Sequence, residues 1–288
     1  MTTRAPQQEE GAKPRVTAHT RVLCLLGDPV EHSLSPVMQN AAILETGVDG
    51  VYVALRCDDE QVPSLMTALA RAGGAGNVTL PHKERAATVV DVPSDAVRRT
   101  GACNTFWGVD GKIHGDNTDV EGFQRALQAF LQEEPAGSRV LVLGAGGAAR
   151  AILVGLLDDG VDEVLLLNRT VERARAVARR IGGERVRVAP GPSAVEGESF
   201  DLVVNATRLG LSPDDPLPLD LDGVGDLGAV MDLVYGEGGT PLVRIARERG
   251  IPATDGAEML VRQGAVSFER WWERHAPVDV MRRALVDS

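Results

Sequence analysis

The segment from Gly76 to Gly122 contains the side chains best suited to chemistry. It holds Lys83, Asp119 and the Asn-Thr pairs 104–105 and 117–118, in stretches too short or too broken by glycine to be helix interiors. Lysine occurs only at positions 13, 83 and 112. Unlike arginine, a lysine whose pKa is lowered by burial can exchange a proton near neutral pH. We therefore interpret Lys83 and Asp119 as a proton-transfer pair, with an ordinary surface ion pair as the alternative.

The bulk composition is that of a globular protein. The chain of 288 residues, 43 % hydrophobic and 25 % charged, is long enough for two domains. Its net charge of −11 disfavours nucleic acid and anionic membranes, and no apolar run reaches the length of a membrane helix. Cys24, Cys57 and Cys103 are too widely spaced to indicate a disulfide framework or a zinc site. We therefore expect no metal and a reducing, cytoplasmic location.

The first half of the chain alternates strand and helix patterns, which indicates an α/β unit with functional loops on one edge. Strands are expected at 21–27 and 51–57, and a hairpin with Asp110-Gly111 as its turn precedes the GDNTD motif. Shorter helical patterns are expected at 36–44, 60–72, 84–90 and 94–99.

Two serines precede the first helix. Ser35 is expected to cap a helix that begins at Pro36, with Ser33 beside it. Hydroxyl and free backbone N–H groups at a helix N-terminus suit a carboxylate, so both serines are candidate ligands for one. For Ser35, capping alone is the ordinary alternative.

Residues 139–174 contain the most specific cofactor signal. A strand is followed by GAGGAA from Gly144, then by a helix and a second strand. Glycines at 144 and 146 permit a tight turn against a pyrophosphate. The second strand ends in Asn168-Arg169-Thr170, with Arg173 one turn later, where NAD enzymes place a carboxylate. The arginines therefore favour the 2′-phosphate of NADP, with an arginine-rich surface helix as the alternative.

The rest of the chain continues a doubly wound pattern. Strands are expected at 200–207 and 229–235 and a helix at 241–250. In the amphipathic helix expected at 256–272, Gln263 is the odd polar residue and a candidate to face a ligand. We expect a disordered tail over 1–20, an α/β substrate domain over 21–121 with 255–288, and a Rossmann-type cofactor domain over 122–254.

Taken together, the motifs resemble the shikimate dehydrogenase family from about residue 22 to residue 272. GDPVEHSLSP, GNVTLPHK, GACNT, GDNTD, GAGGAARA, NRT, NAT, DLVY with TPL, and DGAEML with QGA occur in the family's order. The resemblance implies reversible reduction of 3-dehydroshikimate to shikimate with NADPH, a step of chorismate and aromatic amino acid biosynthesis.

The resemblance also implies roles by position. The implied catalytic residues are Lys83 and Asp119, and the implied substrate ligands are Ser33, Ser35, Thr79, Asn104, Tyr235 and Gln263. The implied NADP contacts are Gly144, Ala145, Gly146, Gly147, Ala148, Asn168, Arg169, Thr170, Arg173, Leu233 and Gly256.

Three positions depart from the family pattern: Gln39 stands where many members have His, Arg208 where many have Pro, and Glu258 where Gly is common. The quinate/shikimate branch also tolerates Gln at the first of these positions. An enzyme of the same fold that accepts quinate and NAD is therefore the nearest alternative. A relative that binds the ligand without turnover is the alternative from another class, and the intact Lys83 and Asp119 argue against it. We expect a monomer or homodimer whose only other partner is the small-molecule substrate.

Overall fold

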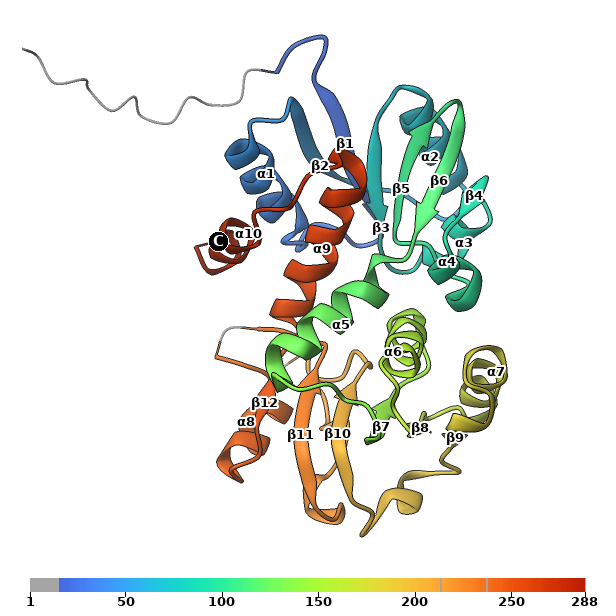
Figure 1. Cartoon of the computed structure of the whole chain (residues 1–288), viewed down its shortest axis with the longest axis vertical. Coiled ribbons are helices and arrows are strands. Elements are labelled where there is room, and N and C mark those ends of the chain that lie inside the picture. Colours follow the sequence, from blue (N-terminus) through green and yellow to red (C-terminus); the bar gives the residue numbers. More distant parts are fainter. Residues whose placement is uncertain (1–15, 213, 237, 288) are drawn as a thin grey trace, which may run out of the picture.

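The computed structural model describes residues 16–212, 214–236 and 238–287 (Figure 1). Of the tail expected over 1–20, residues 1–15 lie outside the described residues, and Thr17 and Thr20 form a turn before the first strand. The chain builds two six-stranded sheets, one above the other in Figure 1, with two long helices between them. The expected α/β class is confirmed.

The first sheet is mixed and has the strand order β2-β1-β3-β5-β6-β4. Its strands are β1 (Arg21–Gly27), β2 (Gly50–Arg56), β3 (Ala75–Val78), β4 (Val92–Pro93), β5 (Thr105–Val109) and β6 (Lys112–Asp116). β1 is parallel to β2 and β3, whereas β5 is antiparallel to β3 and β6. The β5–β6 hairpin turns at Asp110 and Gly111, both with positive φ (50° and 75°), as a two-residue hairpin turn requires. This confirms the expected hairpin.

Short helices connect the strands of the first sheet. They are α1 (Ser35–Thr46), α2 (Val62–Arg71), α3 (Lys83–Ala87) and α4 (Asp95–Thr100). The expected role of Ser35 as the cap of α1 is wrong. The helix already begins at Ser35, its N-cap Leu34 has helical dihedrals, and no side chain caps it. Instead the backbone N–H of Ser35 donates to Ser33 Oγ at 3.3 Å, so the local turn satisfies that N–H and the Ser35 hydroxyl has no capping function.

The second sheet is fully parallel and has the strand order β12-β11-β10-β7-β8-β9. Its strands are β7 (Arg139–Leu143), β8 (Glu163–Leu167), β9 (Val186–Val188), β10 (Phe200–Asn205), β11 (Leu227–Asp232) and β12 (Ala253–Thr254). Helices α6 (Gly147–Asp158), α7 (Val171–Ile181) and α8 (Pro241–Glu248) are its crossovers. The strand order reverses beside β7, which puts the end of β7 at the switch point where such sheets bind ligands.

Two helices lie between the sheets, α5 (Thr118–Leu131) and α9 (Ala257–Trp272), and α10 (Val278–Val286) follows α9 (Figure 1). On α9, Met259 belongs to the core of the second sheet, whereas Phe268 and Trp271 belong to the core of the first. The two helices touch so closely that a Cβ at Gly122 would lie 2.6 Å from the Cα of Gln263. α9 therefore packs against α5 and contributes side chains to the cores of both sheets.

Candidate active site

The structure brings Lys83 and Asp119 together. Lys83 is the first residue of α3 and Asp119 lies in the first turn of α5, and Lys83 Nζ is 2.5 Å from Asp119 Oδ2. The other carboxylate oxygen, Oδ1, accepts from Asn104 Nδ2 at 2.8 Å. The side chains of the pair are only 16 % and 8 % exposed. The pair is thus enclosed, unlike an ordinary surface ion pair, and each carboxylate oxygen has a fixed donor.

Backbone hydrogen bonds hold the loops that carry these groups. Cys103 N donates to Lys83 O at 2.8 Å, and Asn104 N donates to Asp116 O at 3.1 Å. The side chain of Asn104 is oriented by Thr118, whose backbone N–H donates to Asn104 Oδ1 at 2.8 Å. Because that N–H can only donate, the amide nitrogen of Asn104 must face the carboxylate of Asp119.

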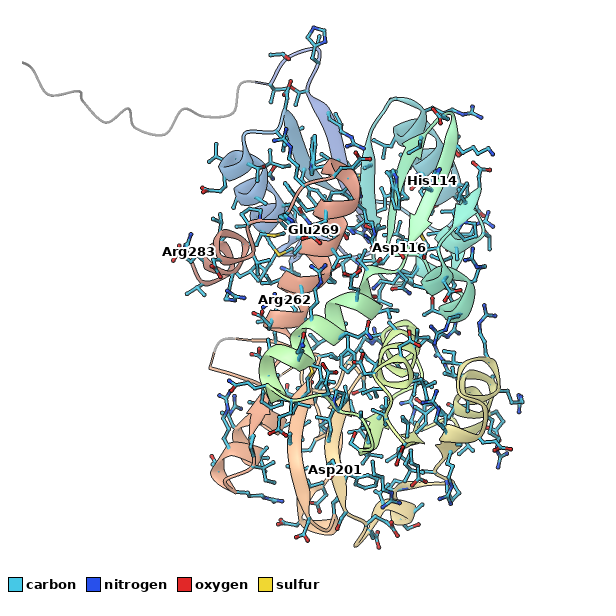
Figure 2. The ribbon with its side chains drawn as sticks, viewed as in Figure 1. His114, Asp116, Asp201, Arg262, Glu269 and Arg283 are labelled. Carbon is cyan, nitrogen blue, oxygen red and sulfur yellow. The ribbon has the colours of Figure 1, made fainter. Side chains whose placement is uncertain are left out.

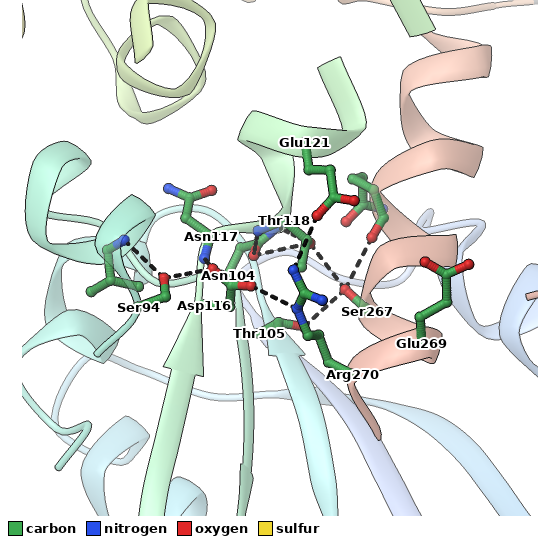
Figure 3. A network of polar contacts seen from close by, with 12 residues as sticks. Ser94, Asn104, Thr105, Asp116, Asn117, Thr118, Glu121, Ser267, Glu269 and Arg270 are labelled. Atoms are coloured by element: carbon green, nitrogen blue, oxygen red, sulfur yellow. Dashed lines mark hydrogen bonds and ion pairs between the residues drawn. The ribbon is translucent and has the colours of Figure 1, made fainter. Parts of the chain in front are cut away.

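Asp116 supports the start of α5 and was not among the residues expected in the site. It lies where β6 meets α5 (Figure 2), and its carboxylate accepts from Ser94 Oγ (2.5 Å), Asn117 N (2.8 Å) and Arg270 Nε (3.0 Å). Asn117 in turn caps α5, since its side chain accepts from Asp119 N at 3.3 Å. Figure 3 shows this network reaching from α4 to Arg270 on α9. The density of polar residues in GDNTD was the signal, but the sequence did not indicate Arg270 as the partner.

Ser33 lies in the loop after β1, Ser35 is the first residue of α1, and Thr79 comes directly after β3. Thr79 N donates to Leu26 O at 2.8 Å, and a Cβ at Gly27 would lie 2.3 Å from the Thr79 methyl group. Glycine at 27 therefore lets the two loops approach. The Ser35 N–H is bonded to Ser33 Oγ and Pro36 has no N–H, so the group offered to an anion at the positive end of α1 is the Ser35 hydroxyl, which caps no backbone group.

The glycine turn after β7 fits a dinucleotide. Gly144 has φ +105° and a Cβ there would lie 2.9 Å from Ala206 O, so only glycine suits this position. A Cβ at Gly146 or Gly147 would instead meet nothing within 4 Å. α6 begins at Gly147 without a side-chain cap. Open space in front of free N–H groups is what a pyrophosphate requires.

The two arginines after β8 differ in their contacts. Arg173 Nε donates to Ala145 O at 3.0 Å, so Arg173 supports the glycine turn. Arg169 is exposed, and no hydrogen bond or ion pair within the described residues engages its guanidinium. Next to it, Asn168 Nδ2 donates to Thr170 O at 2.8 Å and fixes the turn. Arg169 is thus the arginine here that is available to an anionic ligand.

The loop after β11 contains Leu233 and Tyr235, and Gly256 packs against it just before α9. Gly256 N donates to Val234 O at 3.0 Å, and a Cβ at Gly256 would lie 2.1 Å from Leu233 O. Burial raises the pKa of the Tyr235 phenol. Within the described residues no hydrogen bond joins Tyr235 to Lys83 or to Asp119.

Asp232, the last residue of β11, holds this loop in place and was not among the expected site residues. Its fully buried carboxylate accepts from Thr240 Oγ1 (2.6 Å), Asn205 Nδ2 (2.7 Å) and Val234 N (3.0 Å). Burial raises its pKa, and these hydrogen bonds offset only part of that effect. The loop with Leu233 and Tyr235 therefore has a defined conformation.

Gln263 lies on α9, half-buried, with Nε2 donating to Leu260 O at 2.9 Å. Asn77 and Ser267, which the sequence reasoning missed, are buried nearby and bonded to each other at 2.9 Å. Asn77 stands in the GNVTLPHK motif, so its motif was a usable signal. Ser267 had none, because one serine in an amphipathic helix is unremarkable in type and spacing.

The residues that depart from the family pattern have structural partners or are exposed. Gln39 is 1 % exposed and donates from Nε2 to Gly264 O at 2.9 Å, so it fastens α1 to α9. Glu258 pairs with Arg262 at 2.6 Å and with Arg282 at 2.8 Å. Arg208 is exposed.

A parallel sheet with a glycine turn at its switch point, joined to a mixed α/β unit with an enclosed Lys-Asp pair, defines a nucleotide-dependent oxidoreductase. Family profiles match in the same order: the shikimate dehydrogenase substrate binding domain at 25–106, shikimate/quinate 5-dehydrogenase at 126–209, and the shikimate 5′-dehydrogenase C-terminal domain at 256–286. The chain belongs to the shikimate dehydrogenase family.

Known relatives match nearly the whole chain. The shikimate dehydrogenase (NADP(+)) of Methanopyrus kandleri is 40 % identical, over 94 % of this chain and 97 % of the relative. That of Rubrobacter xylanophilus is 42 % identical, over 94 % of this chain and 98 % of the relative. The shikimate 5-dehydrogenase of Thermus thermophilus, solved with NADP(H) and shikimate, superposes with a TM-score of 0.84 at 37 % identity, over 93 % of this chain and 99 % of the other. None of the helices in the described part of the chain is long and apolar enough to cross a membrane.

Proposed function

We propose that this protein catalyses the reversible NADPH-dependent reduction of 3-dehydroshikimate to shikimate, in the biosynthesis of chorismate and the aromatic amino acids. The observation that carries the proposal is the enclosed pair of Lys83 and Asp119, with Asn104 on the second carboxylate oxygen. The names of the relatives support the choice of substrate and cofactor.

Lys83 exchanges the proton in this mechanism. When shikimate is oxidised, its reacting hydroxyl gives its proton to neutral Lys83 Nζ, and in reduction the ammonium returns the proton to the carbonyl oxygen. NADP supplies the complementary chemistry by accepting or donating the hydride. Asp119 orients Lys83 through the 2.5 Å contact, and Asn104 holds Asp119 in place. An ammonium beside the reacting oxygen also stabilises negative charge that develops on it.

The substrate and the cofactor would contact separate loops. Ser33 and Ser35 would hold the substrate carboxylate at the N-terminus of α1, while Thr79, Asn104, Tyr235 and Gln263 would contact the hydroxyl groups or the carboxylate. Gly144 to Ala148 and the start of α6 would hold the pyrophosphate, Asn168 to Arg173 would hold the adenosine 2′-phosphate, and Leu233 and Gly256 would line the rest of the cofactor site. The substrate domain then comprises residues 21–121 with 255–288, and the cofactor domain residues 122–254, which agrees with the division of the strands between the two sheets.

A steady-state assay with shikimate or quinate against NADP or NAD tests the proposal. We expect the highest kcat/KM for shikimate with NADP. Equal or higher kcat/KM for quinate with NAD would favour the quinate alternative, which Gln39 in place of His leaves open. Absence of turnover with all four pairs, together with retained shikimate binding, would favour the non-catalytic alternative.

Replacement of either serine should weaken substrate binding more than turnover. We expect Ser33→Ala and Ser35→Ala each to raise KM for shikimate roughly tenfold or more, because a hydrogen bond to a charged group is worth about 1.5–3 kcal/mol. The carboxylate is remote from the reacting carbon and is held alike in ground and transition states, so kcat should change less. Initial-rate kinetics measure both constants. Unchanged KM in both variants would contradict a carboxylate site at α1.

The location and assembly complete the proposal. The three cysteines, Cys24, Cys57 and Cys103, are buried and unpaired, which supports a reducing compartment such as the cytoplasm. We propose that the protein acts there as a monomer or homodimer.

A further inference from the structure

Ser267 is a fully buried hydroxyl at which three parts of the fold meet. Its Oγ lies 2.9 Å from Asn77 Nδ2 on β3, 2.8 Å from Thr105 Oγ1 on β5 and 3.0 Å from Thr118 Oγ1 on α5. It is also 3.1 Å from Gln263 O, one turn earlier on α9. Figure 3 shows the contacts of Ser267 with Thr105 and Thr118. One side chain of α9 thus connects both strands to the helix that carries Asp119.

The direction of the hydrogen bonds on the β3 side is set by a backbone carbonyl. Asn77 Nδ2 donates to Asn104 O at 3.0 Å, and a carbonyl can only accept. The amide nitrogen of Asn77 therefore faces Asn104 and Ser267. The side-chain oxygen of Asn77 faces the other way and accepts from the hydroxyl of Tyr52 at 2.8 Å. Tyr52 itself is only 1 % exposed.

Asn77 Nδ2 lies within hydrogen-bond distance of Ser267 Oγ and of Thr105 Oγ1, at 2.9 and 2.7 Å. One of its two protons goes to Asn104 O, so the other serves these two hydroxyls together, and Thr105 Oγ1 also donates to Ser267 Oγ. Ser267 Oγ in turn donates to Gln263 O, and in its contact with Thr118 Oγ1 either hydroxyl can be the donor.

The Thr118 hydroxyl lies against the side-chain amide of Asn104. Thr118 Oγ1 is 3.1 Å from Asn104 Oδ1 and 3.0 Å from Asn104 Nδ2, and the Thr118 backbone N–H also donates to Asn104 Oδ1. Thr118 thus fixes the amide of Asn104, whose Nδ2 faces Asp119 Oδ1. A continuous set of hydrogen bonds therefore connects Tyr52 through Asn77, Ser267, Thr118 and Asn104 to the carboxylate of Asp119.

We propose that Ser267 is a positioning residue of the proton-transfer site, which through Thr118 and Asn104 holds the carboxylate of Asp119 as an acceptor facing Lys83. Within the described residues no hydrogen bond joins Ser267 to Lys83 or to Asp119, so it acts through Thr118. The proposal rests on the proposed function for its kinetic consequence, but the alignment of Asn104 is a property of the folded chain alone. Chains of hydrogen bonds in a buried site reinforce one another, so loss of the middle member is felt at the end.

Ser267→Ala and Thr118→Val test the proposal, because each removes one hydroxyl of the chain and retains nearly the same volume. We expect each to lower kcat for shikimate oxidation by roughly tenfold or more, since small displacements of a catalytic group have large effects on rate. KM for NADP should stay unchanged. The double variant should be about as impaired as the worse single variant, because members of one chain are not additive. Thr46→Val is the matched control and should keep wild-type kcat, because Thr46 lies at the far end of α1 and, among the described residues, its hydroxyl is bonded only to the preceding turn.

Amide hydrogen exchange at residue 118 provides a readout that does not depend on activity. The Thr118 N–H is held by Asn104 Oδ1, so its exchange should be at least about tenfold faster in Ser267→Ala than in wild type or Thr46→Val. A folded Ser267→Ala protein with kcat within about twofold of wild type would overturn the proposal. If Ser267→Ala does not fold, Thr118→Val decides by the same two measurements. If wild type shows no shikimate oxidation, the proposed function fails, and unchanged exchange at residue 118 would then overturn the positioning role separately.

Discussion

Replacing Lys83 with alanine should lower kcat by roughly 10²- to 10⁴-fold, the usual contribution of a general acid or base. The lysine is enclosed and bonded to Asp119, so no solvent-exposed group can take over its proton transfer at the same geometry. Binding of NADP and shikimate should remain close to wild type, because all the expected binding groups except Thr79 lie on other loops. Stopped-flow or steady-state measurement of NADPH formation, with fluorescence titration of NADP, separates the two effects.

Two further variants define what the lysine contributes. Lys83→Arg keeps a positive charge but cannot release a proton, so it should be nearly as slow as Lys83→Ala if proton transfer is the function. The exposed Lys112 on the β5–β6 hairpin is the matched control, and Lys112→Ala should retain full activity. Near-normal turnover in Lys83→Arg would show that charge alone suffices.

Asp119 and Lys83 should behave as one unit. The double variant Lys83→Ala with Asp119→Asn should be barely slower than Lys83→Ala alone, because Asp119 acts by orienting a lysine that is no longer present. If the two losses multiply as independent effects, the shared mechanism is wrong.

Removal of Arg169 should change the choice of cofactor. In Arg169→Ala we expect the Kd for NADP to rise roughly 10- to 100-fold, since a hydrogen bond to a charged group is worth about 1.5–3 kcal/mol. Binding of NAD should change little, because NAD has no 2′-phosphate. Arg173 cannot substitute fully, since its Nε is already bonded to Ala145 O. Isothermal titration with both cofactors measures the ratio.

Arg175 on α7, the helix that follows Arg169, is the matched control. Its side chain is 58 % exposed and lies 3.9 Å from Glu172, so Arg175→Ala removes one positive charge from α7 without touching the turn after β8. We expect it to change NADP binding only slightly, as a screened surface charge does. Equal losses for NADP and NAD in Arg169→Ala would mean that Arg169 supports the fold of the turn and does not read the 2′-phosphate.

Local sequence determined the fold class and the position of several turns. Alternating apolar runs and helical patterns predicted the α/β architecture, because the periodicity of burial in strands and helices is set by backbone geometry. Gly144 marked the turn after β7, where φ is +105° and only glycine is suitable. Asp110-Gly111 marked the β5–β6 turn, because this pair is favoured where both central residues have positive φ. The polar motifs also marked Lys83 and Asp119 as candidates.

Only the tertiary structure decided which of these polar groups touch. Lys83 and Asp119 are 36 residues apart, and Asn77 and Ser267 are 190 residues apart, yet each pair is in hydrogen-bond contact. Neither contact follows from the periodicity of the sequence. The contacts depend on the close packing of α9 on α5 at Gly122 and on the register of β3 against β5. Ser35 shows the same limit at short range. Its type predicted a helix cap, but the helix already begins at Ser35, and Leu34 before it has helical dihedrals. An N-cap residue typically has extended dihedrals, which residue type alone does not impose.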